Sequence, residues 1–77
     1  MQGPIIRLLP AKGYGFVRSS ENGLTYFVHA KEVKPRLDFD RLCEGETVEF
    51  DPGENENAQP HQNKLRALNV RRLQRAG

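Results

Sequence analysis

The sequence of 77 residues has little of three things: cysteine, long apolar runs and the features of a secretory signal. The single cysteine, Cys43, excludes an internal disulfide framework and a zinc site built from cysteines. No run approaches the roughly 18–20 apolar residues that a membrane-spanning helix requires. Residues 1–4 have neither the basic flank nor the apolar stretch of a secretory signal. We therefore expect a cytoplasmic protein with no membrane partner.

The short chain also argues against an enzyme. A single domain of this size has little interior for a deep pocket, so we expect no small-molecule substrate. Glu44, Glu46 and Glu49 are close in sequence, but we expect them at exposed positions without the apolar neighbours that acid–base catalysis by paired carboxylates requires. Cys43 is interpreted as a small, partly buried apolar residue, and the two histidines do not complete a metal-ligand spacing with it. We expect no catalytic residue, cofactor or metal.

Charged residues are segregated along the chain, although the net charge is only +2. Residues 1–36 contain six basic side chains against two acidic ones, residues 37–56 contain eight acids against one arginine, and residues 57–77 contain five basic side chains and no acid. Two basic blocks around an acidic one are consistent with one face that binds a polyanion and another that does not. A solvated surface of mixed charge explains the pattern equally well, so charge alone does not decide the function.

Short strands separated by turn residues dominate the pattern. Brief or alternating apolar segments bounded by proline, glycine and asparagine predict five strands, and Asn22-Gly23 is a strong hairpin signal between the second and the third. In the last strand, Leu68 and Val70 are expected to share a face. The last segment has a second interpretation as a basic amphipathic helix. The expected strands are residues 5–9, 13–18, 24–29, 45–50 and 64–73, with a long connection holding at most one helical turn at 30–42 and an exposed loop at 51–62.

This arrangement of strands predicts an all-β fold. Five short strands with one long connection between the third and the fourth are typical of a five-stranded antiparallel OB-fold barrel. The sequence has neither an internal repeat nor a boundary that marks a second domain. We expect residues 1–73 to form one domain and residues 74–77 to be a flexible C-terminal end.

Two adjacent strands contain aromatic side chains at alternating positions, which points to a nucleic-acid-binding surface. Tyr14 and Phe16 share one face of the second strand, and Phe27 and His29 share one face of the third. If these strands pair, the four rings form a platform on which bases can stack, and Lys12 stands at its entrance for a phosphate. The alternative is that the rings belong to the core. We favour the platform, because Val17 and Val28 already supply a buried face and because lysine and histidine are poor core residues.

The same stretch resembles a known family. Residues 12–17, Lys-Gly-Tyr-Gly-Phe-Val, resemble the first ribonucleoprotein motif of the cold-shock domain family, and residues 26–29, Tyr-Phe-Val-His, resemble the second. Residues 39–50 look like the family's stretch that leads through Glu-Gly into the fourth strand, and residues 67–70 look like its Ala-x-Asn-Val ending, so the resemblance covers about residues 3–72. The RNA-recognition motif fits less well, because its second motif lies upstream and it needs two amphipathic helices. The resemblance implies an OB barrel that binds single-stranded RNA or DNA with low sequence selectivity and acts as an RNA chaperone or a cold-shock-like regulator.

The chain departs from the family pattern at several stacking positions. In the register of the family's first strand, Arg7 replaces a tryptophan and Leu8 replaces an adjoining ring, and Ala30 stands where many relatives have an aromatic residue. A guanidinium can stack on a base and also contact a phosphate, so Arg7 is expected to stay in the site with a different balance of forces. Phe39 is expected to be a further stacking ring, the alternative being that it attaches the long connection to the barrel. The expected nucleic-acid-binding residues are Arg7, Lys12, Tyr14, Phe16, Phe27, His29 and Phe39.

Two alternatives to a free nucleic-acid-binding module are open at this point. An OB-type domain can instead dock on a protein or a ribonucleoprotein particle, as a ribosome- or translation-associated domain does. The chain can also be the N-terminal piece of a larger protein. We favour the free nucleic-acid-binding module over both alternatives. We expect single-stranded RNA or DNA as its partner and a monomer or weak dimer as its assembly.

Overall fold

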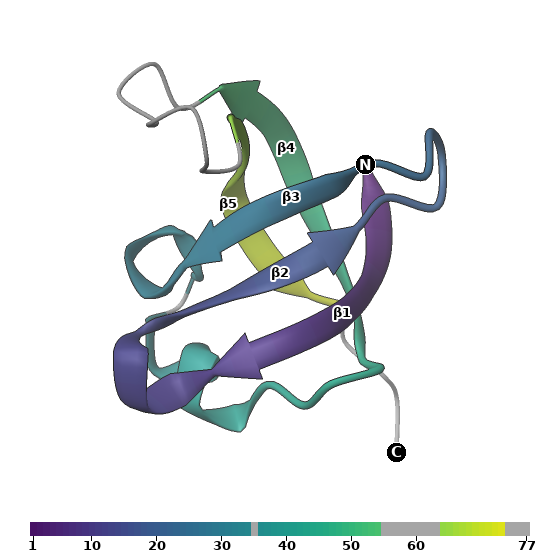
Figure 1. Ribbon diagram of the computed structural model, residues 1–77. Helices are drawn as coiled ribbons and strands as arrows, with labels where there is room; N and C mark the ends of the chain where they lie inside the picture. Colours follow the sequence, from purple (N-terminus) through teal and green to yellow (C-terminus); the bar gives the residue numbers. More distant parts are fainter. Residues whose placement is uncertain (35, 55–63, 74–77) are drawn as a thin grey trace.

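The computed structural model describes residues 1–34, 36–54 and 64–73, and within them five strands form a closed barrel (Figure 1). The order around the barrel is β1-β2-β3-β5-β4, and in Figure 1 the first three strands lie side by side in front of the other two. This confirms the expected five-stranded OB-type barrel. The strands are β1 (Gln2–Leu9), β2 (Tyr14–Arg18), β3 (Thr25–His29), β4 (Thr47–Glu54) and β5 (Leu65–Arg72), and the short 3-10 segments are η1 (Pro10–Lys12), η2 (Ala30–Glu32) and η3 (Arg36–Arg41).

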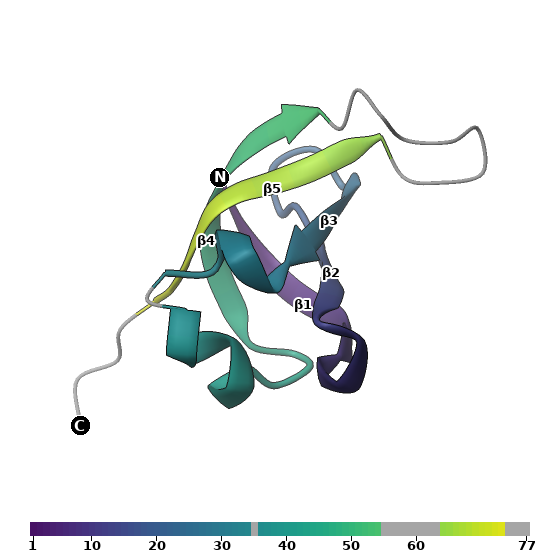
Figure 2. The same cartoon turned by 90° about the vertical axis from the view of Figure 1, so that its left-hand side faces the viewer.

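One neighbouring pair of strands is parallel. β3 and β5 pair in parallel through Phe27 and Arg66, whereas the other neighbours around the barrel are antiparallel. The expectation of a wholly antiparallel barrel is therefore wrong at this contact. The reason is topological, because strand directions cannot alternate all the way round a ring with an odd number of strands. Figure 2 shows β5 running beside β3, so the parallel contact brings a C-terminal residue next to the hairpin of β2 and β3.

Apolar side chains that alternate along the strands fill the barrel. In β2 and β3, Val17, Tyr26 and Val28 are buried, while the residues between them are only partly so. Each such side chain contributes about 1.5–3 kcal/mol by leaving water. The core also takes in residues from the long connection between β3 and β4. Its members are Ile5, Val17, Tyr26, Val28, Val33, Phe39, Leu42, Val48, Phe50, Ala67 and Val70.

β1 contains a bulge that changes which side chains face outward. Its register with β2 pairs Ile5 with Val17 but Arg7 with Phe16, so Ile6 is an extra residue on β1. In a regular strand, Ile5 and Arg7 would share a face, and a buried Ile5 would direct Arg7 inward. The bulge shifts the alternation by one residue, so that Ile5 is buried and Arg7 is exposed.

β5 contains a second bulge, which makes one expectation wrong. Leu68 and Val70 were expected to share a face, but Ala67 and Val70 are the buried residues of this strand. The register with β4 shifts between Glu49 and Asp51, where β5 has one extra residue, and Asn69 has a positive φ of 50°. Asparagine tolerates this left-handed conformation better than most residues, so the strict period of two is broken there.

The outer segments differ from expectation in extent. β4 continues to Glu54, into the segment expected to be a loop, because residues 51–54 pair with residues 65–68. Residues 65–72 form a strand, so the helical interpretation of this segment is wrong. The long connection contains two short 3-10 segments, η2 and η3, where one helical turn was expected.

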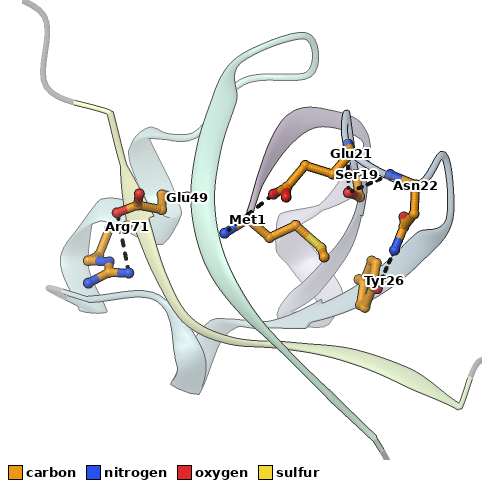
Figure 3. Close-up of polar contacts among 7 residues, drawn as sticks. All are labelled: Met1, Ser19, Glu21, Asn22, Tyr26, Glu49 and Arg71. Atoms are coloured by element: carbon orange, nitrogen blue, oxygen red, sulfur yellow. Dashed lines mark hydrogen bonds and ion pairs between the residues drawn. The ribbon is translucent and has the colours of Figure 1, made fainter.

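The turn between β2 and β3 is built around a buried serine (Figure 3). The Ser19 hydroxyl accepts hydrogen bonds from the backbone N–H groups of Glu21 (3.0 Å) and Asn22 (3.4 Å). The Asn22 amide donates to the Tyr26 hydroxyl at 3.1 Å, which gives the polar end of a buried ring its partner. Gly23 has a φ of 72°, a left-handed conformation in which glycine is not strained. The turn therefore sets the register in which β2 and β3 pair.

Candidate nucleic-acid interface

The β2–β3 hairpin gathers four rings on its outer face. Tyr14 pairs directly with His29, and Phe16 pairs directly with Phe27, so all four side chains point to the same side. Ring centroids are 5.4 Å apart for Tyr14 and Phe27, 5.8 Å for Phe16 and Phe27, 6.0 Å for Tyr14 and Phe16, and 6.2 Å for Phe27 and His29. All four rings are partly buried rather than part of the core. The predicted cluster of four aromatic side chains is thus present, and we call these four residues the aromatic platform.

The platform depends on a close approach of two strands beneath it. Gly15 lies between two platform residues on the inner face of β2, directly opposite Leu8 of β1. A Cβ atom at this position would lie 2.7 Å from the Arg7 carbonyl oxygen and 2.9 Å from Cδ1 of Leu8. Only a glycine fits without displacing β1. Gly15, which separates the two aromatic residues in sequence, therefore allows β1 to pack closely against β2.

The basic residues expected in the site lie at the edges of the platform. Arg7 is exposed and pairs with Phe16, so the bulge at Ile6 brings it onto the outer face beside this ring. Lys12 is exposed at the end of η1, two residues before Tyr14. Among the described residues, neither Arg7 nor Lys12 has a carboxylate partner. Both cations are therefore accessible to a phosphate.

His29 has one ring nitrogen engaged by the backbone. Its Nδ1 atom accepts a hydrogen bond from the N–H of Lys31 at 3.1 Å, where it caps the start of η2. A neutral imidazole that accepts at Nδ1 carries its proton on Nε2. The ring can therefore stack through its face and donate one hydrogen bond through Nε2.

Phe39 does not join the platform. Its side chain is only 4% exposed and is part of the core cluster. The expectation of a further stacking ring at this position is wrong for this structure, and the alternative that Phe39 attaches the long connection to the barrel describes it correctly. The physical reason is that η3 directs its apolar residue toward the barrel and its charged residues toward solvent. Phe39 is buried, whereas Asp40 and Arg41 are exposed.

Cys43 also differs from its expected environment. The residue is exposed rather than partly buried, and its thiol lies 3.8 Å from the carbonyl oxygen of Arg41. The described residues contain no group of three or more histidine, cysteine or carboxylate side chains that could hold a metal ion. In the same part of the chain, no helix is long and apolar enough to cross a membrane.

Two residues of the acidic block pair with arginines of β5. Arg72 Nε is 2.6 Å from a Glu46 carboxylate oxygen. Arg71 Nη2 is 3.3 Å from a Glu49 carboxylate oxygen (Figure 3). These pairs lie along β5 and the start of β4, away from the β2–β3 hairpin. The segregation of charge in the sequence is thus reduced in the folded chain, where acids and bases from distant segments meet.

The register adds one residue that the sequence analysis missed. Arg66 of β5 lies directly opposite Phe27, and Phe27 is opposite Phe16, which is opposite Arg7. The outer face therefore has one row of four residues across four strands, with an arginine at each end and two phenylalanines between them. No signal in the sequence links residues 27 and 66, because their contact depends on how the barrel closes.

The sequence model of the "Cold-shock" DNA-binding domain family matches residues 1–73. A search of curated proteins found no match.

Proposed function

The chain belongs to the family of "Cold-shock" DNA-binding domains, and on this premise we propose that it binds single-stranded RNA or DNA on the aromatic platform. Membership of this family implies nucleic-acid binding. In our proposal, bases stack on Tyr14, Phe16, Phe27 and His29, while Arg7 and Lys12 contact phosphates at the edges. The observation that carries the proposal is the contiguity of the four rings, with neighbouring centroids 5.4–6.2 Å apart.

The chemistry of the platform supports single strands rather than a duplex. The bases of a single strand can unstack and present their faces to aromatic rings, and each stacked base is worth about 1–3 kcal/mol whatever its identity. In a duplex the faces are covered by neighbouring base pairs. A flat surface of rings therefore favours an unpaired strand with little preference for sequence.

We further propose that binding of this kind prevents or melts RNA secondary structure, as an RNA chaperone does. A protein that binds only the unpaired strand stabilises that strand by mass action. The platform has three carbon rings and one imidazole, and Arg7 lies opposite Phe16, at the position where the family resemblance implies a further ring. We assign this activity to a domain of residues 1–73; the end expected at residues 74–77 lies outside the described residues.

The test is a comparison of single strands with a duplex. Fluorescence anisotropy of labelled oligo-dT, oligo-U and a duplex of the same length gives the three dissociation constants. We expect both single strands to bind more tightly than the duplex. Equal binding of the duplex would mean that phosphate charge, not stacking, carries the affinity. No binding of either strand would refute the proposal and favour an OB-type domain that docks on a protein or a ribonucleoprotein.

Intrinsic fluorescence gives an independent measurement at the platform. The chain has two tyrosines and no tryptophan, and Tyr26 is buried while Tyr14 belongs to the platform. The variant Tyr26→Phe leaves Tyr14 as the single tyrosine. We expect oligo-dT to quench its emission, because a base stacked on a ring changes the excited state directly. An unchanged emission at saturating oligonucleotide would place the bound strand elsewhere.

A further inference from the structure

Arg66 occupies the β5 end of the row that contains the two phenylalanines of the platform. Its partner across the parallel contact is Phe27, and the residues on either side of it in β5, Leu65 and Ala67, pack on or in the core. Arg66 therefore points to the outer face of the barrel, as Phe27 does. A strand bound along this row would meet a guanidinium at each end.

In the free protein, the Arg66 side chain is held by a carboxylate but not fully satisfied. Its Nη2 atom is 3.4 Å from a carboxylate oxygen of Glu32, with the two side chains 32% and 24% exposed. Its Nε atom is buried and has no hydrogen-bond partner among the described residues. The other Glu32 oxygen accepts the backbone N–H of Asn69 at 3.3 Å, at the bulge of β5. One Glu32 oxygen is therefore engaged by the backbone of β5, whereas Arg66 has a long contact and an Nε donor without a partner.

We propose that Glu32 competes with a phosphate of the bound strand for Arg66, an inference that rests on the proposed function. A phosphate offers the guanidinium two acceptor oxygens in a geometry that the single oxygen of Glu32 does not match. Binding then exchanges the Arg66–Glu32 contact for an Arg66–phosphate contact, and the freed carboxylate stays at the edge of the site. Glu32 thus lowers the affinity for the polyanion, and it does so through Arg66.

The contribution of each residue can be estimated. One phosphate contact on a single strand adds about −0.7 to the slope of the logarithm of the binding constant against the logarithm of the salt concentration. Such a contact therefore raises the affinity about eightfold at about 50 mM salt relative to its contribution at about 1 M salt. Loss of Arg66 should therefore weaken binding by about eightfold at low salt and flatten the slope by about 0.7. Removing the competitor should tighten binding by about two- to fivefold, the factor that corresponds to one exposed ion pair.

The experiment is a double-mutant cycle with Glu32→Gln and Arg66→Gln, measured by anisotropy with labelled oligo-dT over a range of salt. Glutamine keeps an acceptor for the Asn69 N–H but removes the charge. Glu49→Gln is the matched control, because it removes the same charge from an ion pair of similar length with Arg71 that lies outside the row. Arg66→Lys keeps the positive charge at the edge of β5, so it tests whether the salt slope depends on that charge.

We expect Glu32→Gln to tighten binding by about two- to fivefold in the wild-type background and by less than twofold together with Arg66→Gln. Glu49→Gln should have less than a twofold effect in both backgrounds, and Arg66→Lys should keep the wild-type salt slope. An equal gain from Glu32→Gln in both backgrounds would mean a general charge effect and overturn the inference. Weaker binding by Glu32→Gln would make Glu32 a residue that positions Arg66 and would also overturn it. If the wild type binds but Glu32→Gln has no effect, this inference fails alone; if the wild type binds no single strand, the proposed function fails with it.

Discussion

Phe27 lies at the centre of the aromatic platform, which makes its substitution the sharpest test of base stacking. Its ring is 5.4–6.2 Å from the rings of Tyr14, Phe16 and His29, more ring contacts than any other platform residue has. If one base stacks on this ring, Phe27→Ala should weaken single-strand binding by about 1–3 kcal/mol, or roughly five- to 150-fold. The loss should be similar for oligo-dT and oligo-U, because stacking does not depend on hydrogen bonding between the bases and the protein.

The same substitution should have a moderate effect on folding. A fully buried phenylalanine costs roughly 3–5 kcal/mol when replaced by alanine, because an empty cavity adds to the lost transfer energy. Phe27 is only partly buried and opens to solvent, so water fills the space and the cavity term is absent. The transfer term for full burial is about 1.5–3 kcal/mol, so we expect Phe27→Ala to lower the free energy of unfolding by less than this.

Two matched variants separate stacking from packing. Phe27→Leu keeps most of the apolar volume without a flat ring, so it should keep the stability but lose most of the affinity that Phe27→Ala loses. Phe50→Leu changes a fully buried ring of the core, so it should lower stability and leave binding intact. Anisotropy titrations and urea denaturation on the same preparations give both numbers. Wild-type affinity in Phe27→Leu, or a stability loss in Phe27→Ala as large as that of a core phenylalanine, would refute the platform.

Three further predictions concern Arg7 at the edge of the platform, Gly15 beneath it and Phe39 in the barrel core. Arg7→Ala should weaken single-strand binding and flatten the salt slope by about 0.7, whereas Arg7→Trp should flatten the slope equally but strengthen binding at high salt; an unchanged slope in Arg7→Ala would place β1 outside the site. Gly15→Ala should destabilise the fold by about 1–3 kcal/mol, because its Cβ would lie 2.7 Å from a backbone oxygen of β1. Gly13→Ala has open space around its Cβ but a φ of 79°, so it should cost about 1 kcal/mol. If the thermal denaturation curve of Gly15→Ala equals that of the wild type, the close approach of β1 and β2 is contradicted. Phe39→Leu should lower the urea midpoint and leave oligo-dT affinity unchanged, and a selective loss of affinity would return Phe39 to the binding surface.

The sequence determines the strands of this protein and the aromatic platform. Alternation with a period of two is local information, because the direction of each side chain follows from that of its neighbour along the strand. The positions of Tyr14 and Phe16 in one strand and Phe27 and His29 in the next, with a strong turn between, are enough to bring four rings together. The family model also extends over nearly the whole chain, matching residues 1–73.

The tertiary structure decides what depends on contacts between distant segments. The bulges at Ile6 and Asn69 break the period of two, and with it the prediction of which residues face inward, because an extra residue is accommodated only when a neighbouring strand fixes the register. Phe39 and Cys43 lie in the long connection, where no periodicity constrains them, and their burial depends on how that segment closes the barrel. Arg66 reaches Phe27 only through the parallel contact that an odd number of strands makes necessary. The sequence alone thus determines the rings of the platform, whereas the closed barrel decides which charges stand beside them.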